Sequence, residues 1–226
     1  MKFLYLIDDH DVLRIGVADW MRHNSDWKIA GQASYTQDAL QLIESIETKK
    51  ENVYVAVVDL SLKEPGSIDN TLGFTVLKAI KDSGKDIRSV VYTSFDSGFY
   101  VNKAMSDEYK ALGYVSKNSS IHTLLDAINS AAEGQTYIQQ ELKRTVTETG
   151  TMLEALTKKE RIVIDCIAQG LGNQEAAEKL GISIRTLENH LGHIYDKTDT
   201  HDKNSMLLKL GYVVADSTSQ YTQEGV

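Results

Sequence analysis

The chain has 226 residues, of which 42% are hydrophobic and 25% are charged, and its formal net charge at pH 7 is −8. This is the composition of a globular protein with room for two domains, and the acidic balance excludes a broadly basic nucleic-acid coat. Because it has no run of about 18 apolar residues and no N-terminal secretory pattern, we expect neither membrane association nor secretion. The single cysteine, Cys166, fits a cytoplasmic location.

Five short apolar runs alternate with amphipathic stretches in the first part of the chain. The runs cover residues 3–7, 28–34, 53–58, 88–93 and 113–116. The stretches between them have helical spacing, and the last one ends at Gly134. Strands that alternate with helices predict an α/β domain, in which a doubly wound, five-stranded parallel sheet carries helices on both faces.

Carboxylates follow two of these expected strands. Asp8 and Asp9 come after the first strand, and Asp59 comes after the third. In the strand order 2-1-3-4-5 the first and third strands are neighbours, so the three carboxylates meet at the carboxyl edge of the sheet. Their mutual repulsion requires compensation, and oxygen ligands of this kind suit Mg²⁺. The sequence therefore predicts a magnesium site.

Two further polar residues end strands at the same edge. Thr93 ends the fourth strand and offers a hydroxyl, and Lys117 follows the fifth and offers a cation. A metal, a lysine and a hydroxyl together form a pocket for a phosphoryl group. Asp59 is the expected nucleophile that accepts this group.

The second part of the chain has a different pattern. Residues 135–153 lose clear periodicity, and we interpret them as a linker with some helical ends after a first domain over residues 1–134. Short helices are expected at about 157–169, 174–180, 184–197 and 203–213, which gives a small all-α domain over residues 154–214. Residues 215–226 are polar and aperiodic, and we expect a disordered tail.

Two of the expected helices form a helix-turn-helix. "TKKE" at 157–160 is a capping box for the first helix of this domain, and "LGIS" forms the tight turn before the helix that starts near Ile184. On that helix we expect a buried stripe of Ile184, Leu187, Leu191 and Ile194. The outward face could enter the major groove of DNA.

The whole pattern resembles the bacterial two-component response regulators of the NarL/FixJ type, in which a receiver domain precedes a LuxR-type helix-turn-helix. The resemblance spans roughly residues 2–214. It is carried by the acidic pair, the acceptor aspartate, a threonine, an aromatic residue and a lysine, here Asp8, Asp9, Asp59, Thr93, Tyr114 and Lys117, and by "LTKKERIVIDCIAQGLGNQEAAEKLGISIRTLENHLGHIYDK".

The resemblance implies a flavodoxin-like receiver whose Asp59 is phosphorylated by a sensor histidine kinase. The metal ligands would include the backbone carbonyl at Ser61, and the Thr93 hydroxyl would move inward while Tyr114 rotates into the vacated space. The protein would then bind promoter DNA as a homodimer, and it would not be an enzyme beyond slow loss of its own phosphoryl group. The expected DNA-binding residues are Lys158, Gln174, Arg185, Thr186, Glu188, Asn189, His190, His193, Lys197 and Lys203.

Three features leave alternatives open. About six extra residues precede Gly73, either as a tolerated surface insertion or as a lid beside the pocket. The helix-turn-helix segment is nearly neutral, so it could dock a protein in place of DNA, or the receiver could act without phosphate. "DDHD" also resembles the nucleophile motif of haloacid-dehalogenase-like phosphatases, but the position of Asp59 fits that class poorly.

Overall fold

The computed structural model describes residues 1–64 and 71–212. The chain divides into two compact units. One holds residues 1–96 and 100–143, and the other holds residues 97–99 and the chain from Arg144 onward. The expected tail and residues 65–70 of the insertion lie outside the described residues. No helix within the described ranges is long and apolar enough to cross a membrane.

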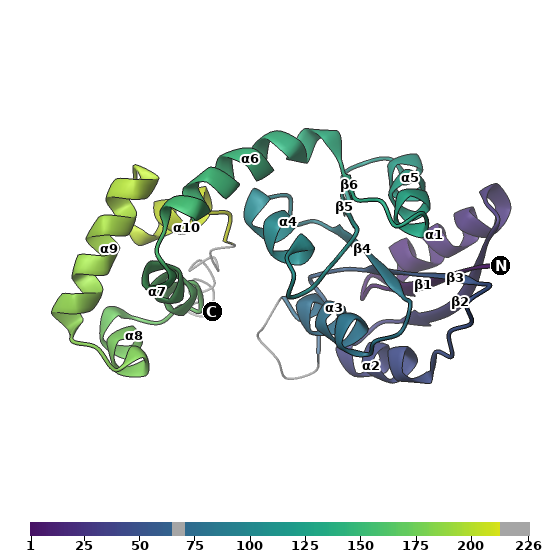
Figure 1. The fold of residues 1–226 in the computed structure, drawn as a ribbon, viewed down its shortest axis with the longest axis horizontal. Helices are drawn as coiled ribbons and strands as arrows, with labels where there is room; N and C mark the ends of the chain where they lie inside the picture. Colours follow the sequence, from purple (N-terminus) through teal and green to yellow (C-terminus); the bar gives the residue numbers. More distant parts are fainter. Residues whose placement is uncertain (65–70, 213–226) are drawn as a thin grey trace, which may run out of the picture. The chain divides into compact units, whose positions relative to one another are not determined.

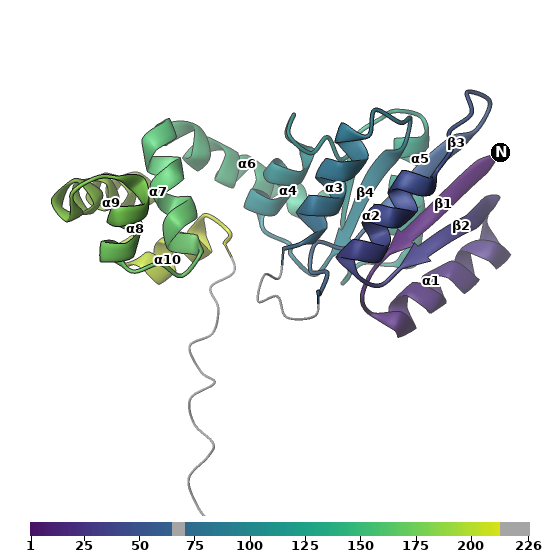
Figure 2. The ribbon, with the colours of Figure 1, turned by 90° about the horizontal axis from the view of Figure 1, so that it is seen from below.

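A parallel sheet forms the centre of the first unit. In the described residues it has six strands in the order β2-β1-β3-β4-β5-β6, and Figure 2 shows β1 between β2 and β3. The strands are β1 (Lys2–Ile7), β2 (Trp27–Ala33), β3 (Val53–Val58), β4 (Arg88–Thr93), β5 (Gly113–Ser116) and β6 (Tyr137–Ile138). The central strands are buried on both faces, which explains their nearly continuous apolar sequences.

Helices cover both faces of this sheet, as expected (Figure 1). α1 (Asp11–Asn24) and α5 (Ile121–Ala132) pack on one face, where a single apolar cluster joins them to the strands. α2 (Thr36–Ser45) and α3 (Gly73–Asp82) lie on the other face, and α4 (Gly98–Met105) follows β4. The Trp27 side chain, 2% exposed, belongs to the first cluster and donates its indole N–H to Asn129 Oδ1 at 3.0 Å.

The segment 135–153 differs from the prediction, because it is regular rather than a linker with helical ends. It contains β6, which pairs in parallel with β5 and adds a sixth strand to the expected five, and most of α6 (Gln140–Ala155). The Tyr137 amide donates to Leu112 O at 2.8 Å and fixes the register. A strand of two residues has no alternation, and the threonines of α6 interrupt its apolar spacing, so neither element was visible in the sequence.

The second unit is helical. After α6 come α7 (Lys158–Ala168), α8 (Asn173–Leu180), α9 (Ile184–Thr198) and α10 (Lys203–Lys209), which enclose an apolar cluster of their own. α8 ends at Gly181, whose φ of 64° is left-handed, and α9 begins with Ser183 Oγ accepting the Thr186 N–H at 3.1 Å. These two caps make the short turn between α8 and α9.

Candidate functional site

Three carboxylates meet at the carboxyl ends of β1 and β3, as predicted. Ile7 and Val58 are paired in the sheet, so the residues that follow them leave it side by side, and the Asp59 amide donates to Ile7 O at 2.9 Å. Asp59 is 1% exposed and Asp8 is 7% exposed. The topology therefore concentrates negative charge where water can screen it only weakly.

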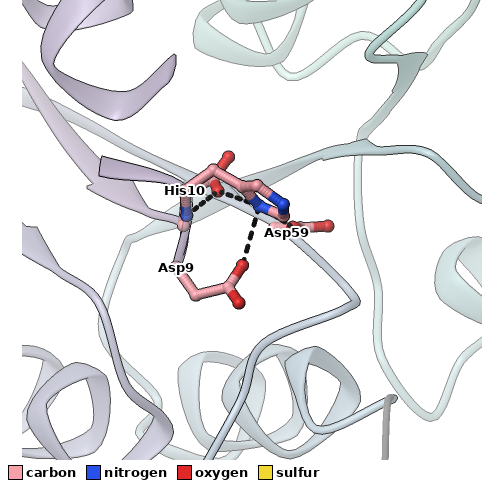
Figure 3. A group of neighbouring side chains, drawn as sticks. Asp9, His10 and Asp59 are labelled. Atoms are coloured by element: carbon pink, nitrogen blue, oxygen red, sulfur yellow. Dashed lines mark hydrogen bonds and ion pairs between the residues drawn. The ribbon is translucent and has the colours of Figure 1, made fainter. Parts of the chain in front are cut away.

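The donor set of this cluster fits a divalent cation. One potential ligand atom from each of Asp8, Asp9, His10 and Asp59 lies within 4.8 Å of the other three, and Figure 3 shows three of these side chains converging. Asp9 Oδ1 is buried and accepts no hydrogen bond from the described residues. A buried carboxylate oxygen that accepts no hydrogen bond and lies beside other carboxylates fits a ligand of a divalent cation.

Lys117 reaches the same cluster from the end of β5. Its Nζ lies 2.6 Å from Asp59 Oδ2 and 2.8 Å from Asp8 Oδ2, and its side chain is 8% exposed. Burial by itself would lower the pKa of Lys117, but the Asp59 and Asp8 carboxylates outweigh burial and the pKa is raised. Burial raises the pKa of Asp8, although the hydrogen bond from Lys117 opposes this. One buried ammonium thus faces three carboxylates, which leaves the pocket short of positive charge.

Thr93 and Tyr114 lie in the interior beside this pocket. Thr93, at the end of β4, is fully buried, and the Phe95 amide contacts its hydroxyl oxygen at 3.5 Å. Tyr114, in β5, is also fully buried and donates its hydroxyl to Phe95 O at 2.5 Å. Burial holds the pKa of the Tyr114 phenol well above its usual value. The Tyr114 ring therefore lies in the interior, with its hydroxyl on the backbone of the segment that follows β4.

The loop after Asp59 is shaped by two small residues. Ser61 donates its amide to Asp59 Oδ1 at 3.1 Å and its hydroxyl to Oδ2 at 2.9 Å, which holds the carboxylate still. Gly73 begins α3 directly against this loop, and its amide donates to Leu60 O at 3.0 Å. A Cβ on Gly73 would come within 2.1 Å of Asp59 O, so only glycine fits there.

Two residues that the sequence prediction omitted also contact the cluster. His10 Nδ1 lies 2.9 Å from Asp9 Oδ1, and Lys63 Nζ lies 3.2 Å from Asp9 Oδ2. His10 stands inside the acidic run itself, so the signal for it was present as a metal-binding residue type. Lys63 lies in the loop that leads to the insertion, where no periodicity could place it.

The helix-turn-helix presents most of the predicted DNA-binding residues on its surface. On α9 the side chains of Arg185, Thr186, Glu188, Asn189 and His193 are exposed, and His190 is half-buried. Lys158 and Gln174 are exposed near the starts of α7 and α8, and Lys203 is half-buried at the start of α10. The surface of α9 thus offers polar groups of the kind that can read base edges.

The expected buried stripe of α9 is correct except for its first member. Leu187, Leu191 and Ile194 are at most 4% exposed, whereas Ile184 is 39% exposed. Ile184 is the first residue of α9, directly after the N-cap Ser183. The core of this unit therefore begins one turn later than the spacing suggested.

Comparisons with known proteins agree with both units. Residues 4–129 match the model of the response regulator receiver domain, and residues 154–209 match that of bacterial regulatory proteins of the luxR family. The chain belongs to the LuxR-type response regulators. These are transcription regulators with a receiver and a DNA-binding helix-turn-helix, and they are not classical enzymes.

Relatives and solved structures cover nearly the whole response regulator. It is 28% identical over 216 residues to the oxygen regulatory protein NreC of Staphylococcus aureus, with 90% of this chain and 94% of that protein covered. NreC of Staphylococcus epidermidis is 27% identical over 217 residues. A structure of RcsB from Salmonella enterica serovar Typhimurium, bound to a promoter in the presence of the phosphomimetic BeF₃⁻, has a TM-score of 0.67 and 19% identity, and covers 94% of this chain and 98% of that one.

Lys197, a predicted DNA-binding residue of this response regulator, forms an ion pair inside its own unit. Lys197 Nζ lies 2.7 Å from Glu160 Oε2, and Glu160 also accepts the Thr157 amide at 2.7 Å, which confirms the predicted capping box. Burial would raise the pKa of Glu160, but the hydrogen bonds from Lys197 and Thr157 outweigh burial and lower it. Lys197 therefore ties α9 to α7.

Replacing Glu160 with glutamine is expected to destabilise this unit by about 1–3 kcal/mol, because charged hydrogen bonds are lost. A carboxylate whose pKa is lowered by folding adds stability above its unfolded pKa and loses it as the pH falls through the folded pKa. The difference in free energy of unfolding between the natural protein and Glu160→Gln should therefore be largest near pH 7 and shrink below about pH 4. Thermal unfolding followed by circular dichroism measures it.

The exposed Glu178 provides the control for this experiment. It lies in α8 of the same unit and accepts a hydrogen bond from Gln174 at 2.7 Å. Glu178→Gln should leave stability nearly unchanged at every pH, because exposed contacts contribute little. Equal and small losses for the two variants would show that Glu160 and Lys197 do not stabilise the unit.

Proposed function

We propose that this response regulator is switched by phosphorylation of Asp59 by a sensor histidine kinase, and that the phosphorylated form binds promoter DNA as a homodimer. The observation that carries the proposal is the Asp59 carboxylate, 1% exposed, held by Lys117 and Ser61 beside a cluster short of positive charge. A chain with a DNA-binding domain acts in the compartment that holds the DNA, which we take to be the cytoplasm.

The transfer itself requires only an oriented carboxylate and compensation of charge. An Asp59 oxygen forms the bond to phosphorus as the bond from phosphorus to the kinase's histidine nitrogen breaks. Lys117, 2.6 Å from Asp59 Oδ2, can follow the phosphoryl oxygens and neutralise part of their charge. We propose that the acyl phosphate is afterwards lost slowly to water, whose attack on phosphorus releases inorganic phosphate and restores the Asp59 carboxylate.

Mg²⁺ is the ion that we assign to this function. Asp8, Asp9, Asp59 and the backbone carbonyl at Ser61 would hold it, and the fit is supported by Asp9 Oδ1, which is buried and accepts no hydrogen bond from the described residues. When bound, the ion neutralises charge on the carboxylates and on the phosphoryl oxygens. Its protein ligands leave positions open for these oxygens and for water.

Thr93 and Tyr114 are the residues that we propose to report the phosphorylated state. The Thr93 hydroxyl, whose contact with the Phe95 amide is long at 3.5 Å, can turn to donate to a phosphoryl oxygen. The inward position of Tyr114 depends on one hydrogen bond to Phe95 O and on burial of the ring. Phosphorylation would then favour the inward arrangement over an outward one, as a ligand selects one of two states.

The experiment that tests this function measures binding of a labelled duplex, taken from upstream of the gene for this protein, over a series of salt concentrations. We expect tighter binding with Mg²⁺ and beryllofluoride than without them, and affinity that falls steeply with salt. The slope of log affinity against log salt should be near −0.9 for each phosphate contact that a basic residue makes. With Lys158, Arg185 and Lys203 of two protomers as candidates, a slope of about −5 is expected.

No binding in either state, even at low salt, would contradict this proposal and favour protein docking by the nearly neutral second unit. Equal binding with and without beryllofluoride would favour a receiver that acts without phosphate. Sedimentation of the same samples checks the homodimer, because the mass should double when the phosphate mimic is added.

A further inference from the structure

We propose that His10 is a ligand of the divalent cation through Nδ1, and that this imidazole makes the site select a borderline transition-metal ion, such as Co²⁺, Ni²⁺ or Zn²⁺, more strongly than oxygen ligands alone would. The inference rests on the proposed Mg²⁺ site and adds the class of competing ions whose affinity His10 would raise.

The position of His10 is fixed by the acidic run in which it stands. Its amide donates to Asp8 Oδ1 at 2.8 Å, which ties the residue to the first carboxylate. Its ring then turns back over the pocket, so that Nδ1 lies 2.9 Å from Asp9 Oδ1, 3.3 Å from Asp8 Oδ1 and 4.0 Å from Asp59 Oδ2 (Figure 3). One nitrogen thus approaches all three carboxylates.

These separations match those between ligands of one ion. Bonds of about 2.1 Å in a six-coordinate site place adjacent ligand atoms about 3.0 Å apart and opposite ones about 4.2 Å apart. The first two distances from Nδ1 are close to the adjacent value, and the third is close to the opposite value. A single ion could therefore contact Nδ1 and the carboxylate oxygens with small movements.

The contact between His10 and Asp9 is not explained by a hydrogen bond. The Asp9 side chain is 5% exposed, and its Oδ1 has no hydrogen-bond partner in the described part of the chain although Nδ1 is 2.9 Å away. Lys117 Nζ lies 3.5 Å from Nδ1, on the side from which it can donate, so Nδ1 can carry a lone pair. With the lone pair on Nδ1, a cation bound between Nδ1 and Asp9 Oδ1 would compensate both electron-rich atoms. With a proton on Nδ1, the same ring would form an ion pair with Asp9 and a hydrogen bond to Asp8 Oδ1 at 3.3 Å, and metal binding would have to displace that proton.

The chemistry of the ligands gives the selectivity. Mg²⁺ prefers carboxylate, carbonyl and water oxygen, whereas imidazole nitrogen suits Zn²⁺, Ni²⁺ and related ions. Replacing one oxygen position by nitrogen therefore raises the affinity for the borderline ions and adds little for Mg²⁺. His10 also has 56% of its side chain exposed, so an ion can enter and leave past it.

The test compares binding of Mg²⁺ and Ni²⁺ to the full chain by isothermal titration calorimetry, for the natural protein, His10→Ala and His10→Asn. We expect both variants to bind Ni²⁺ at least tenfold more weakly and Mg²⁺ less than threefold more weakly. His23→Ala is the matched control, because His23 on α1 contacts the exposed carboxylate of Asp19 at 3.6 Å outside the site. This variant should bind both ions as the natural protein does.

A spectroscopic readout identifies the ligand atom directly. Zn²⁺ should shift the ¹⁵N resonance of His10 Nδ1, assigned by its absence in His10→Ala, and leave that of His23 unchanged. Equal losses of Ni²⁺ and Mg²⁺ affinity would show that His10 only positions Asp9, and unchanged affinities would show that it is a surface residue; either overturns the inference while the proposed function stands. Failure of every ion to bind the natural protein would overturn both.

Discussion

Asp59→Asn is expected to lose all labelling by a small phosphodonor in the presence of Mg²⁺. The amide is neutral and a poor nucleophile, so no acyl phosphate forms, and the response of DNA binding to beryllofluoride should vanish with it. Binding of Mg²⁺ should weaken but stay detectable, since Asp8 and Asp9 remain. Radiolabel retained after gel filtration measures the first effect.

Asp11→Asn is the matched control for this substitution. Asp11 belongs to the same acidic run, but its exposed carboxylate pairs with Arg14 at 2.7 Å and not with the cluster. Labelling of this variant should equal that of the natural protein. Because Asp59→Asn also removes one of three crowded negative charges, the midpoint temperature of its thermal unfolding should be no lower than that of the natural protein. Radiolabel that persists on Asp59→Asn would place the phosphoryl acceptor at another residue.

Gly73→Ala is expected to damage the same pocket through the backbone. The new methyl group would lie 2.1 Å from Asp59 O and 2.5 Å from Leu60 Cα, which are main-chain atoms that cannot turn aside. Overpacking of this kind costs about 1–3 kcal/mol or more, and relief requires a shift of the loop that carries Asp59. We expect a lower unfolding midpoint in urea and loss of tight beryllofluoride binding.

Gly16→Ala separates this effect from the general preference of helices for alanine. Gly16 lies within α1, and a Cβ there would meet nothing within 4 Å. This substitution should stabilise the protein by about 0.5–1 kcal/mol and leave beryllofluoride binding unchanged. If Gly73→Ala behaved like Gly16→Ala, the close approach of α3 to the Asp59 loop would not constrain the site.

The sequence was sufficient to predict the elements that have a clear local pattern. The positions of the first five strands follow from apolar runs that end in polar residues, and the order of a doubly wound sheet then brings Asp8, Asp9, Asp59 and Lys117 together. β6 could not be predicted, because two residues carry no period, and its pairing depends on the exposed edge of β5. The burial of a side chain at the end of a helix was also not predicted, since Ile184 has the spacing of the buried stripe but is 39% exposed at the first position of α9.

Contacts between side chains that are brought together by packing could not be predicted either. Lys197 was expected on DNA because of its charge, yet Glu160, 37 positions earlier, lies next to it once α7 and α9 pack. His10 was adjacent to the predicted ligands, but the direction of its ring depends on the hydrogen bond from its amide to Asp8. Contacts of this kind are decided by tertiary packing, which a local pattern does not contain.

The placement of the tryptophans makes the two units separately observable in one sample. The chain has two, Trp20 in α1 and the buried Trp27 in β2, and both belong to the first unit. Emission from the indoles therefore follows unfolding of the receiver alone, whereas far-ultraviolet ellipticity sums over all the helices. An intact chain in which emission changes at one denaturant concentration and ellipticity in two steps would show directly that the receiver and the DNA-binding unit melt independently.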